Sequence, residues 1–313
     1  MSFSLVFTVS PIIRALDVRN LGRAILWVIR IHALIIVAMA TSNLALGTQL
    51  YRFANLGNYT PETFIAWGRV SGLFAEPAYF GWFVALGLFT LLNISIRYKI
   101  HTISILDYLL LVLALLFSTS LAGVTVGLIA LFGTVWVRMF YLTPNIGQKL
   151  LATSTLTIGL IIVLVLFSSN PTQTAYLFDR LSNITTDASF QDRIPGSLEA
   201  SRYIFLQNPL TGTGLGNLAQ SVKDGMPFFI YKWPENIDIH ISWAAVFATT
   251  GLFGGVIYAL MLFGTVIDQN SRPLGWGLIL VSFVYGGFAL GVLWWFLALT
   301  LVFQKPQLIW RSS

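Results

Sequence analysis

Long apolar runs separated by short polar intervals dominate the chain, and most runs have the length of a membrane-crossing helix. A bilayer core is crossed by about 20 apolar residues in helical form. We expect helices at about 24–46, 77–96, 104–118, 121–137, 149–167 and 240–267. The last apolar stretch, 274–303, is long for one crossing and short for two, which favours two short helices joined by a turn near Gly286.

This pattern predicts an all-α fold: one polytopic transmembrane helical bundle of about seven to eight spans, forming a single membrane domain over residues 1–313. The apolar segment at the N-terminus is too short to span a bilayer, so we interpret it as a stub or a short interfacial segment. With 56% hydrophobic and 10% charged residues and a mean hydropathy of +0.79, the composition points to the same class.

One long polar interval, residues 168–239, interrupts the apolar pattern. It carries acidic and basic residues at a density that the apolar runs lack. A helical bundle does not need such a loop in order to fold. We therefore interpret the loop as the part of the protein that carries the functional site and the transmembrane helices as its structural support. Short helices are expected inside the loop.

The formal net charge of +6 is explained most simply by the excess of Lys and Arg in cytoplasmic segments of membrane proteins. Short basic intervals near Arg23, Arg97, Arg138 and Arg272 all fall on one side when the predicted helices alternate in direction. This topology places the 168–239 loop outside the cytoplasm. The less favoured alternative explanation is attraction to anionic lipid headgroups or to a phosphorylated substrate, and no nucleic-acid surface is predicted.

The first cluster of candidate functional residues lies at the outer mouth of the second predicted helix. Arg69 and Glu76 are seven residues apart, which places them on one face of a continuous helix. Pro77 suits the first turn of a helix, and Glu76 would sit near its positive end. The structural alternative is a helix cap with an ion pair.

The second cluster lies in the loop, where Arg193 and Arg202 precede the segment TGTGLGN (211–217). Guanidinium groups bind phosphate oxygens through paired hydrogen bonds. Three alternating glycines, Gly212, Gly214 and Gly216, let the backbone approach a ligand or simply form a tight turn. The turn is favoured on spacing alone, since the dinucleotide-binding fingerprint has a different spacing and a different context.

The third candidate is His240, at the point where the loop returns to an apolar run, shortly after Glu235 and Asp238. An imidazole can accept a proton near neutral pH. The ordinary alternative is an interfacial histidine. Two further polar residues, Arg30 and His32, lie inside the first predicted helix. We expect Arg30 to extend its charge to the membrane surface and His32 to hydrogen-bond within the bundle.

Other chemistry is not indicated by the sequence. With no cysteine, disulfides, thiol nucleophiles and thiolate metal sites are excluded. The chain also lacks HExxH, phosphate-binding-loop and serine-elbow motifs, so we expect neither a metal site nor a cofactor.

Taken together, these segments resemble the O-antigen polymerase and O-antigen ligase family of bacterial polytopic membrane glycosyltransferases. RVSGLFAEPAYFG (69–81) is similar to a family segment, and STSLAG (118–123) is similar to the family's small-residue turn. In the loop, the order and spacing of Arg193, Pro209 and the glycines match. His240 followed by Gly251 and Gly254 is similar to the pattern that opens the next helix.

The resemblance implies an inverting, metal-independent transfer of a polyprenyl-diphosphate-linked oligosaccharide on the outer, periplasmic side of the bacterial inner membrane. It implies that Arg193 holds the diphosphate, with Arg202 and Arg69 as second choices. His240 then positions or activates the acceptor, and Glu76 orients Arg69. Gly212, Gly214 and Gly216 have supporting roles. Membrane lipid and other membrane proteins of polysaccharide assembly are the further expected partners.

The chain departs from the family pattern in ways that favour a polymerase over a ligase. Leu121 and Ala122 stand where ligases often carry Arg, and Ile241 follows His240 where ligases often have a polar residue. The N-terminal helices that members of the family usually have are not evident in this sequence, which favours a compact member or a truncated chain. Two other functions stay open: a solute transporter with Arg30 and His32 lining its path, and a non-catalytic assembly partner.

Overall fold

The computed structural model describes residues 18–45, 77–98, 103–142, 145–169, 171–186, 188–214, 239–283 and 296–300, together with the single positions 70, 74, 217 and 303. Over this part of the chain the regular structure is entirely helical, which confirms the all-α prediction. The chain divides into two compact units: a bundle unit over Leu16–Ser182 and a C-terminal unit that includes Asn183–Ser313. The division falls inside the predicted loop.

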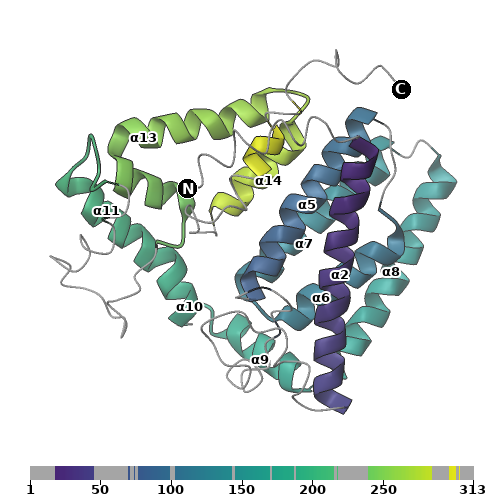
Figure 1. The fold of residues 1–313 in the computed structure, drawn as a ribbon. Coiled ribbons are helices and arrows are strands. Elements are labelled where there is room, and N and C mark those ends of the chain that lie inside the picture. The colour runs from purple at the N-terminus through teal and green to yellow at the C-terminus, as the bar shows by residue number, and fades with distance from the viewer. Residues whose placement is uncertain are drawn as a thin grey trace. The chain divides into compact units, whose positions relative to one another are not determined.

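The bundle unit consists of six α-helices and one short π-helix among its described residues (Figure 1). They are α2 (Val18–Ala45), α5 (Pro77–Tyr98), α6 (Ile105–Ser118), α7 (Leu121–Val137), η1 (Arg138–Leu142), α8 (Ile146–Ser168) and α9 (Pro171–Ser182). The first five α-helices agree closely with the predicted ranges. α5 begins at Pro77, as expected for proline in a first helical turn.

Local sequence explains where these helices start. The Ser104 side chain accepts from the Asp107 backbone N–H, and the Asp107 carboxylate accepts from the Ser104 N–H at 2.7 Å, which forms a complete capping box. Between α6 and α7 the chain reverses at Thr119, in the left-handed region with φ 47°, and Ser120 caps the new helix. The small-residue turn predicted at 118–123 is confirmed.

The core of the bundle is built around α5, whose side chains are buried on nearly all sides by α2, α6 and α7. Its closest partner is α7. A Cβ added to Gly81 would lie 2.1 Å from the carbonyl oxygen of Gly123, so only glycine permits this crossing. Such close approach of small residues is the usual means of packing helices in membranes, where lipid gives no hydrophobic drive for helix association.

An ion pair crosses the bundle between α2 and α6. Arg30 Nε donates to Asp107 Oδ1 at 2.6 Å, and Arg30 Nη2 donates to Asp107 Oδ2 at 2.8 Å. That Arg30 extends its charge to the membrane surface, as expected from the sequence, stays a prediction, and the contact adds a partner that the sequence did not suggest. Its guanidinium meets a carboxylate 77 residues away in the sequence, where both charges are neutralised in paired, charge-assisted hydrogen bonds.

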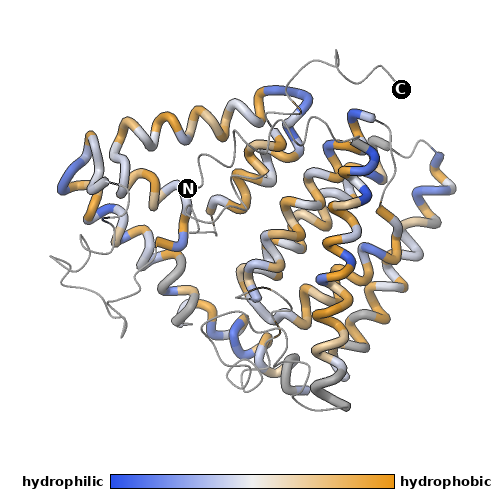
Figure 2. The backbone as a smooth tube through the Cα atoms, viewed as in Figure 1, coloured by the Kyte–Doolittle hydropathy of each residue, from blue (hydrophilic) through white to orange (hydrophobic). Residues whose placement is uncertain are grey.

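Basic side chains gather at one end of the bundle. Because α2, α6 and α8 begin there and α5 and α7 end there, this end collects Arg19, Arg23, Arg97, Arg138 and Lys149. Figure 2 shows hydrophilic positions at the corresponding ends of α2, α5 and α8. At the same end, an Arg138 guanidinium nitrogen donates to the Ile103 carbonyl oxygen.

The C-terminal unit is also helical where it is described. Its elements are α10 (Ala188–Gln191), η2 (Asp192–Gly196), α11 (Ser197–Gln207), α13 (Ser242–Ile267) and α14 (Arg272–Ser282). Together with α9 of the bundle unit, α10, η2 and α11 confirm that the long polar interval contains short helices. α14 ends at Ser282, and the turn predicted near Gly286 lies outside the described residues.

The apolar run predicted as one helix over 240–267 is broken at Gly251. This residue has φ 63° and ψ −160°, a conformation open essentially to glycine alone. The second half folds back over the first, so that a Cβ on Gly255 would lie 2.4 Å from the Phe247 ring (Figure 1). The prediction of a continuous helix was wrong because a glycine inside an apolar run leaves the hydrophobic pattern unchanged.

Within the described part of the chain, four helices are long and apolar enough, by length and composition, to cross a membrane: Arg19–Thr41, Pro77–Tyr98, Leu121–Phe140 and the bent Ser242–Ile267. Two shorter apolar helices, Ile105–Ser118 and Ile146–Ile162, accompany them. Much of α8 exposes apolar side chains, among them Ile158, Ile161 and Ile162. Several apolar helices with such faces indicate a membrane protein.

Candidate functional site

The predicted site residues are distributed unevenly over the described structure. His240, Arg202, Gly212 and Gly214 are described in full, whereas Arg193 is described through the backbone of η2. Arg69, Glu76 and Gly216 lie outside the described residues. The four residues of the first group and Arg193 all belong to the C-terminal unit, so their arrangement can be followed within one compact body.

A buried serine joins the His240 segment to the beginning of α11. The His240 backbone N–H donates to Ser197 Oγ at 2.9 Å, across 43 residues of sequence. Ser197 is the first residue of α11 and is 2% exposed. The contact brings the point where the loop ends to the point where α11 begins.

Apolar packing holds both sides of this contact. Ile239 and Ile241, the two neighbours of His240, are 0% and 3% exposed. They belong to a core cluster with Ala200 and Ile204 of α11 and with Ala244, Ala245 and Ala248 of α13. Ile241 is extended, with φ −120° and ψ 113°, and successive side chains of an extended chain point to opposite sides. With both isoleucines buried, His240 is directed outward and its side chain is partly exposed.

The segment that contains Arg193 lies directly before Ser197 in the chain. This segment, η2, is a π-helical turn over Asp192–Gly196 that contains Pro195 and leads directly into α11. Arg193 thus precedes the serine that binds His240 by four residues. π-helical turns are rare and often occur at functional sites. The structure therefore brings the Arg193 segment and His240, which the sequence separates widely, to one end of α11.

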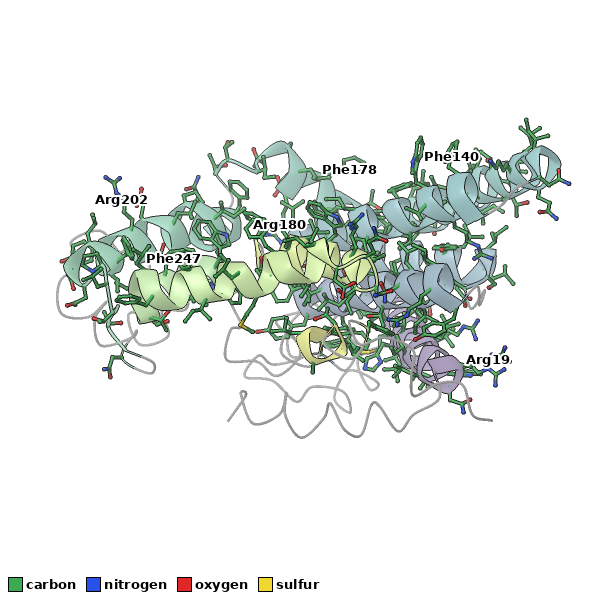
Figure 3. The ribbon with its side chains drawn as sticks, turned by 90° about the horizontal axis from the view of Figure 1, so that it is seen from above. Arg19, Phe140, Phe178, Arg180, Arg202 and Phe247 are labelled. Carbon is green, nitrogen blue, oxygen red and sulfur yellow. The ribbon has the colours of Figure 1, made fainter. Side chains whose placement is uncertain are left out.

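Arg202 occupies a different face of α11. The buried side of this helix carries Ser197, Ala200, Ser201 and Ile204. Arg202 is exposed, and Figure 3 shows its side chain projecting outward from α11. Phe205 and Phe247 link α11 to α13 further along, with ring centroids 6.1 Å apart. Arg202 is therefore not grouped with His240 by the fold.

The glycine segment lies at the opposite end of α11 and docks into the break of α13. The Thr213 and Gly214 N–H groups donate to the carbonyl oxygens of Ala248 and Thr249 at 3.2 and 2.8 Å. In return, the Leu252 N–H donates to the Pro209 carbonyl oxygen at 2.8 Å. These bonds satisfy backbone groups that the break would leave without helical partners.

Two glycines make this docking possible. Gly212 has φ 65°, and a Cβ there would lie 2.4 Å from the Thr249 carbonyl carbon. A Cβ on Gly251 would lie 2.4 Å from the carbonyl carbon of Leu210. The tight turn favoured at 211–217 is confirmed over its described part. The close backbone approach of Gly212 is to α13, about one helix length from His240.

The segments that support the family resemblance also meet in the bundle unit. Gly123, from the small-residue turn, packs against Ala78 and Gly81 at the start of α5. His32, in α2, makes a 2.8 Å hydrogen bond between Nδ1 and the Val28 carbonyl oxygen, and its ring contacts Phe74 at 4.9 Å between centroids. The first arrangement is a contact between packed helices, and the second combines a bond within α2 with aromatic packing.

Comparison of the chain with protein-family models, curated proteins and solved structures finds no match. The family resemblance therefore stays a prediction. Among the described residues, no group of three or more His, Cys, Asp or Glu side chains lies close enough to hold a metal ion.

Sequence reasoning missed Ser197. One signal was present, since Ser197 follows Pro195-Gly196 directly and so stands where a helix commonly begins. A helix-starting serine is usually a cap, and nothing in the sequence connects it to a residue 43 positions later.

Proposed function

We propose that this protein is a membrane glycosyltransferase of the O-antigen polymerase or ligase type, with polymerase favoured. It transfers an oligosaccharide from a polyprenyl diphosphate carrier to an acceptor sugar. One observation carries the proposal: the fold places the Arg193 segment and His240, which belong to separate candidate clusters of the sequence, at one end of α11. The apolar helices support placement of the protein in a bilayer, which is where a lipid-linked substrate is found.

The proposed chemistry uses the two residues in different roles. The acceptor hydroxyl attacks the anomeric carbon of the lipid-linked sugar, and the bond between that carbon and the diphosphate oxygen breaks with inversion. The His240 imidazole takes the hydroxyl proton, and the polyprenyl diphosphate leaves with the bonding electron pair. Arg193 binds the diphosphate, because a guanidinium stabilises the growing negative charge through paired hydrogen bonds.

The electrostatic setting of His240 suits an anionic leaving group. α13 begins immediately after it, and no side chain caps that helix N-terminus. The positive end of a helix dipole favours nearby negative charge. Arg202 and Arg69 remain second choices for the diphosphate, with Glu76 orienting Arg69. The exposed position of Arg202 on another face of α11 makes it the weaker of the two loop arginines.

The proposed topology follows from charge. We place the basic end of the bundle, with Arg23, Arg97, Arg138 and Lys149, in the cytoplasm, since cytoplasmic segments of membrane proteins are enriched in Lys and Arg. The 168–239 loop then lies on the periplasmic side of the bacterial inner membrane, where lipid-linked glycans are polymerised in such systems. Membrane lipid and other polysaccharide-assembly proteins are the proposed partners.

Transport of a small solute is the second candidate, and the break in α13 is the observation that favours it. Broken helices often surround the substrate sites of transporters. Here the backbone groups at the break are bonded to residues 209–214. Arg30, the residue expected to line a path, is paired with Asp107, and His32 is packed against aromatic rings. These contacts favour the transferase.

The test is the length distribution of surface glycans in the native host after deletion of the gene. We expect wild type to restore a ladder of polymer lengths, and Arg193→Ala and His240→Ala to leave single-repeat glycans although both proteins reach the membrane. Arg202→Ala tests the second-choice arginine on the other face of α11 and should retain most of the ladder. Arg193→Lys should be nearly inactive, because a point charge does not replace the paired hydrogen bonds.

Three outcomes separate the alternatives. Polymer that accumulates on the lipid carrier without reaching its final acceptor would identify the missing step as ligation. A full ladder in both alanine variants would refute the site. Unchanged glycans after deletion would refute glycosyl transfer and make solute uptake the next assay.

A further inference from the structure

The contact between Ser197 and His240 joins the start of α11 to the segment just before α13. A hydroxyl oxygen on the first residue of α11 accepts from the backbone N–H of His240, the residue that directly follows the long loop, at 2.9 Å. Ser197 is 2% exposed, so water does not compete readily for its hydroxyl. The bond fixes the main chain at His240 and leaves the imidazole outside the buried cluster.

The contact also fixes the distance between two elements. Because η2 runs without interruption into α11, any displacement of the His240 backbone from Ser197 is a displacement from the Arg193 segment as well. Ile239 and Ile241 limit rotation by burying their side chains on either side. The hydrogen bond to Ser197 fixes the distance between the His240 main chain and the start of α11.

We propose that Ser197 is a positioning residue, which holds His240 at a set distance from the Arg193 segment during transfer. The proposal rests on the proposed function, and it adds a third residue to that site. Ser197 does not itself contact the reacting atoms. It acts through the His240 backbone, so its loss should affect the chemical step more than the binding of substrate.

The expected effect follows from the sensitivity of catalysis to geometry. Displacement of a reacting group by about 1 Å can lower a rate on the order of 100-fold. We expect Ser197→Ala to lower kcat by about 10- to 100-fold with KM changed less than about threefold. Ser197→Thr keeps a hydroxyl acceptor and should recover most of the lost kcat.

The chain offers a closely matched control in the same helix. Ser201 is also buried in α11, but its hydroxyl donates to the Leu198 carbonyl oxygen, within its own helix, at 3.0 Å. Ser201→Ala removes a buried hydroxyl without touching the His240 segment. It should retain wild-type kcat, whereas a general loss of stability in α11 would lower activity in both alanine variants.

The experiment combines turnover with hydrogen exchange. Purified wild type, Ser197→Ala, Ser197→Thr, Ser201→Ala and His240→Ala are reconstituted in vesicles with the lipid-linked oligosaccharide extracted from the gene-deleted host, and initial rates are measured against substrate concentration. Deuterium uptake is followed in the peptide that contains Ile239–Ile241. Only Ser197→Ala should exchange the His240 amide faster, because it alone removes the acceptor of that N–H.

The outcomes separate the two proposals. A slow Ser197→Ala with near-normal KM, faster His240 exchange and recovery in Ser197→Thr supports the positioning role. Wild-type kcat in Ser197→Ala, in a preparation where His240→Ala is inactive, overturns the positioning role and leaves the proposed function standing. Absence of transfer by wild type overturns the proposed function. In that case unchanged exchange in Ser197→Ala overturns the structural part of the inference, and faster exchange supports it.

Discussion

At the scale of single residues, the bundle depends on a charge pair that stands inside apolar helices. Ionised groups in such a setting require partners. Asp107 accepts from the Arg30 guanidinium and from the Ser104 hydroxyl and backbone N–H. Arg30 also lies over the Trp27 ring, with its guanidinium carbon 5.5 Å from the ring centroid. The pair thus ties α2 to α6 with bonds that apolar packing alone does not provide.

We expect Asp107→Asn to destabilise the protein by roughly 1–3 kcal/mol, since it leaves the Arg30 charge without its partner but keeps an oxygen for the Ser104 N–H. Thermal unfolding in detergent gives the measurement. Arg30→Met combined with Asp107→Asn should cost less than the sum of the two single changes. Strict additivity in this double-mutant cycle would show that the two side chains do not interact.

This pair marks a limit of sequence reasoning. Arg30 was recognised as a residue that needs an explanation, and the correct class of explanation was a partner. Asp107 is 77 positions away and was assigned to no cluster, because a helix-starting acid is fully explained by local capping. The capping role alone accounts for an acid at this position, so nothing in the sequence points to the tertiary contact.

At the scale of elements, paired glycines replace side-chain packing at two places. Gly81 and Gly123 bring the α5 and α7 backbones together, and Gly212 and Gly251 bring the loop backbone to the break in α13. The sequence motifs contained all four glycines. The motifs could not reveal that Gly81 approaches Gly123 or that Gly212 and Gly251 each approach the backbone beside the other, since spacing along the chain carries no information on the partner.

We expect Gly251→Ala to destabilise the C-terminal unit by roughly 2 kcal/mol or more, from the strain of its positive φ and from contact with the Leu210 backbone. Gly264→Ala is the control, because a Cβ at Gly264 meets nothing within 4 Å in the same helix. Limited proteolysis of the two variants in membranes measures the difference in their stability. Equal resistance of the two variants would argue that α13 is not broken at Gly251.

At the scale of the whole molecule, the hydrophobic pattern predicted the helices and their order well, because a lipid-facing or buried helix must be apolar along its length. It did not predict that α13 folds back on itself or that the chain divides into two compact units. Both properties depend on contacts between distant segments. The predicted count of seven to eight spans stays a prediction, and the described residues contain four helices that are long and apolar enough to cross.

The absence of cysteine makes the proposed topology directly measurable. We expect Asn208→Cys, at an exposed position after α11, to react with a membrane-impermeant maleimide in intact cells. Gln148→Cys, exposed at the basic end of the bundle, should react only after the membrane is opened. The unsubstituted protein supplies the unlabelled control. The reverse labelling would place the loop in the cytoplasm and exclude the periplasmic site.

The central claim is that His240 and Arg193 form a site for glycosyl transfer from a lipid diphosphate. The most direct measurement is the release of polyprenyl diphosphate from extracted lipid-linked oligosaccharide by the purified protein in vesicles. Wild type should release one carrier for each glycosidic bond formed, and Arg193→Ala and His240→Ala should each release it at least about 100-fold more slowly. Release at the wild-type rate by either variant, or no release by wild type, would contradict the account.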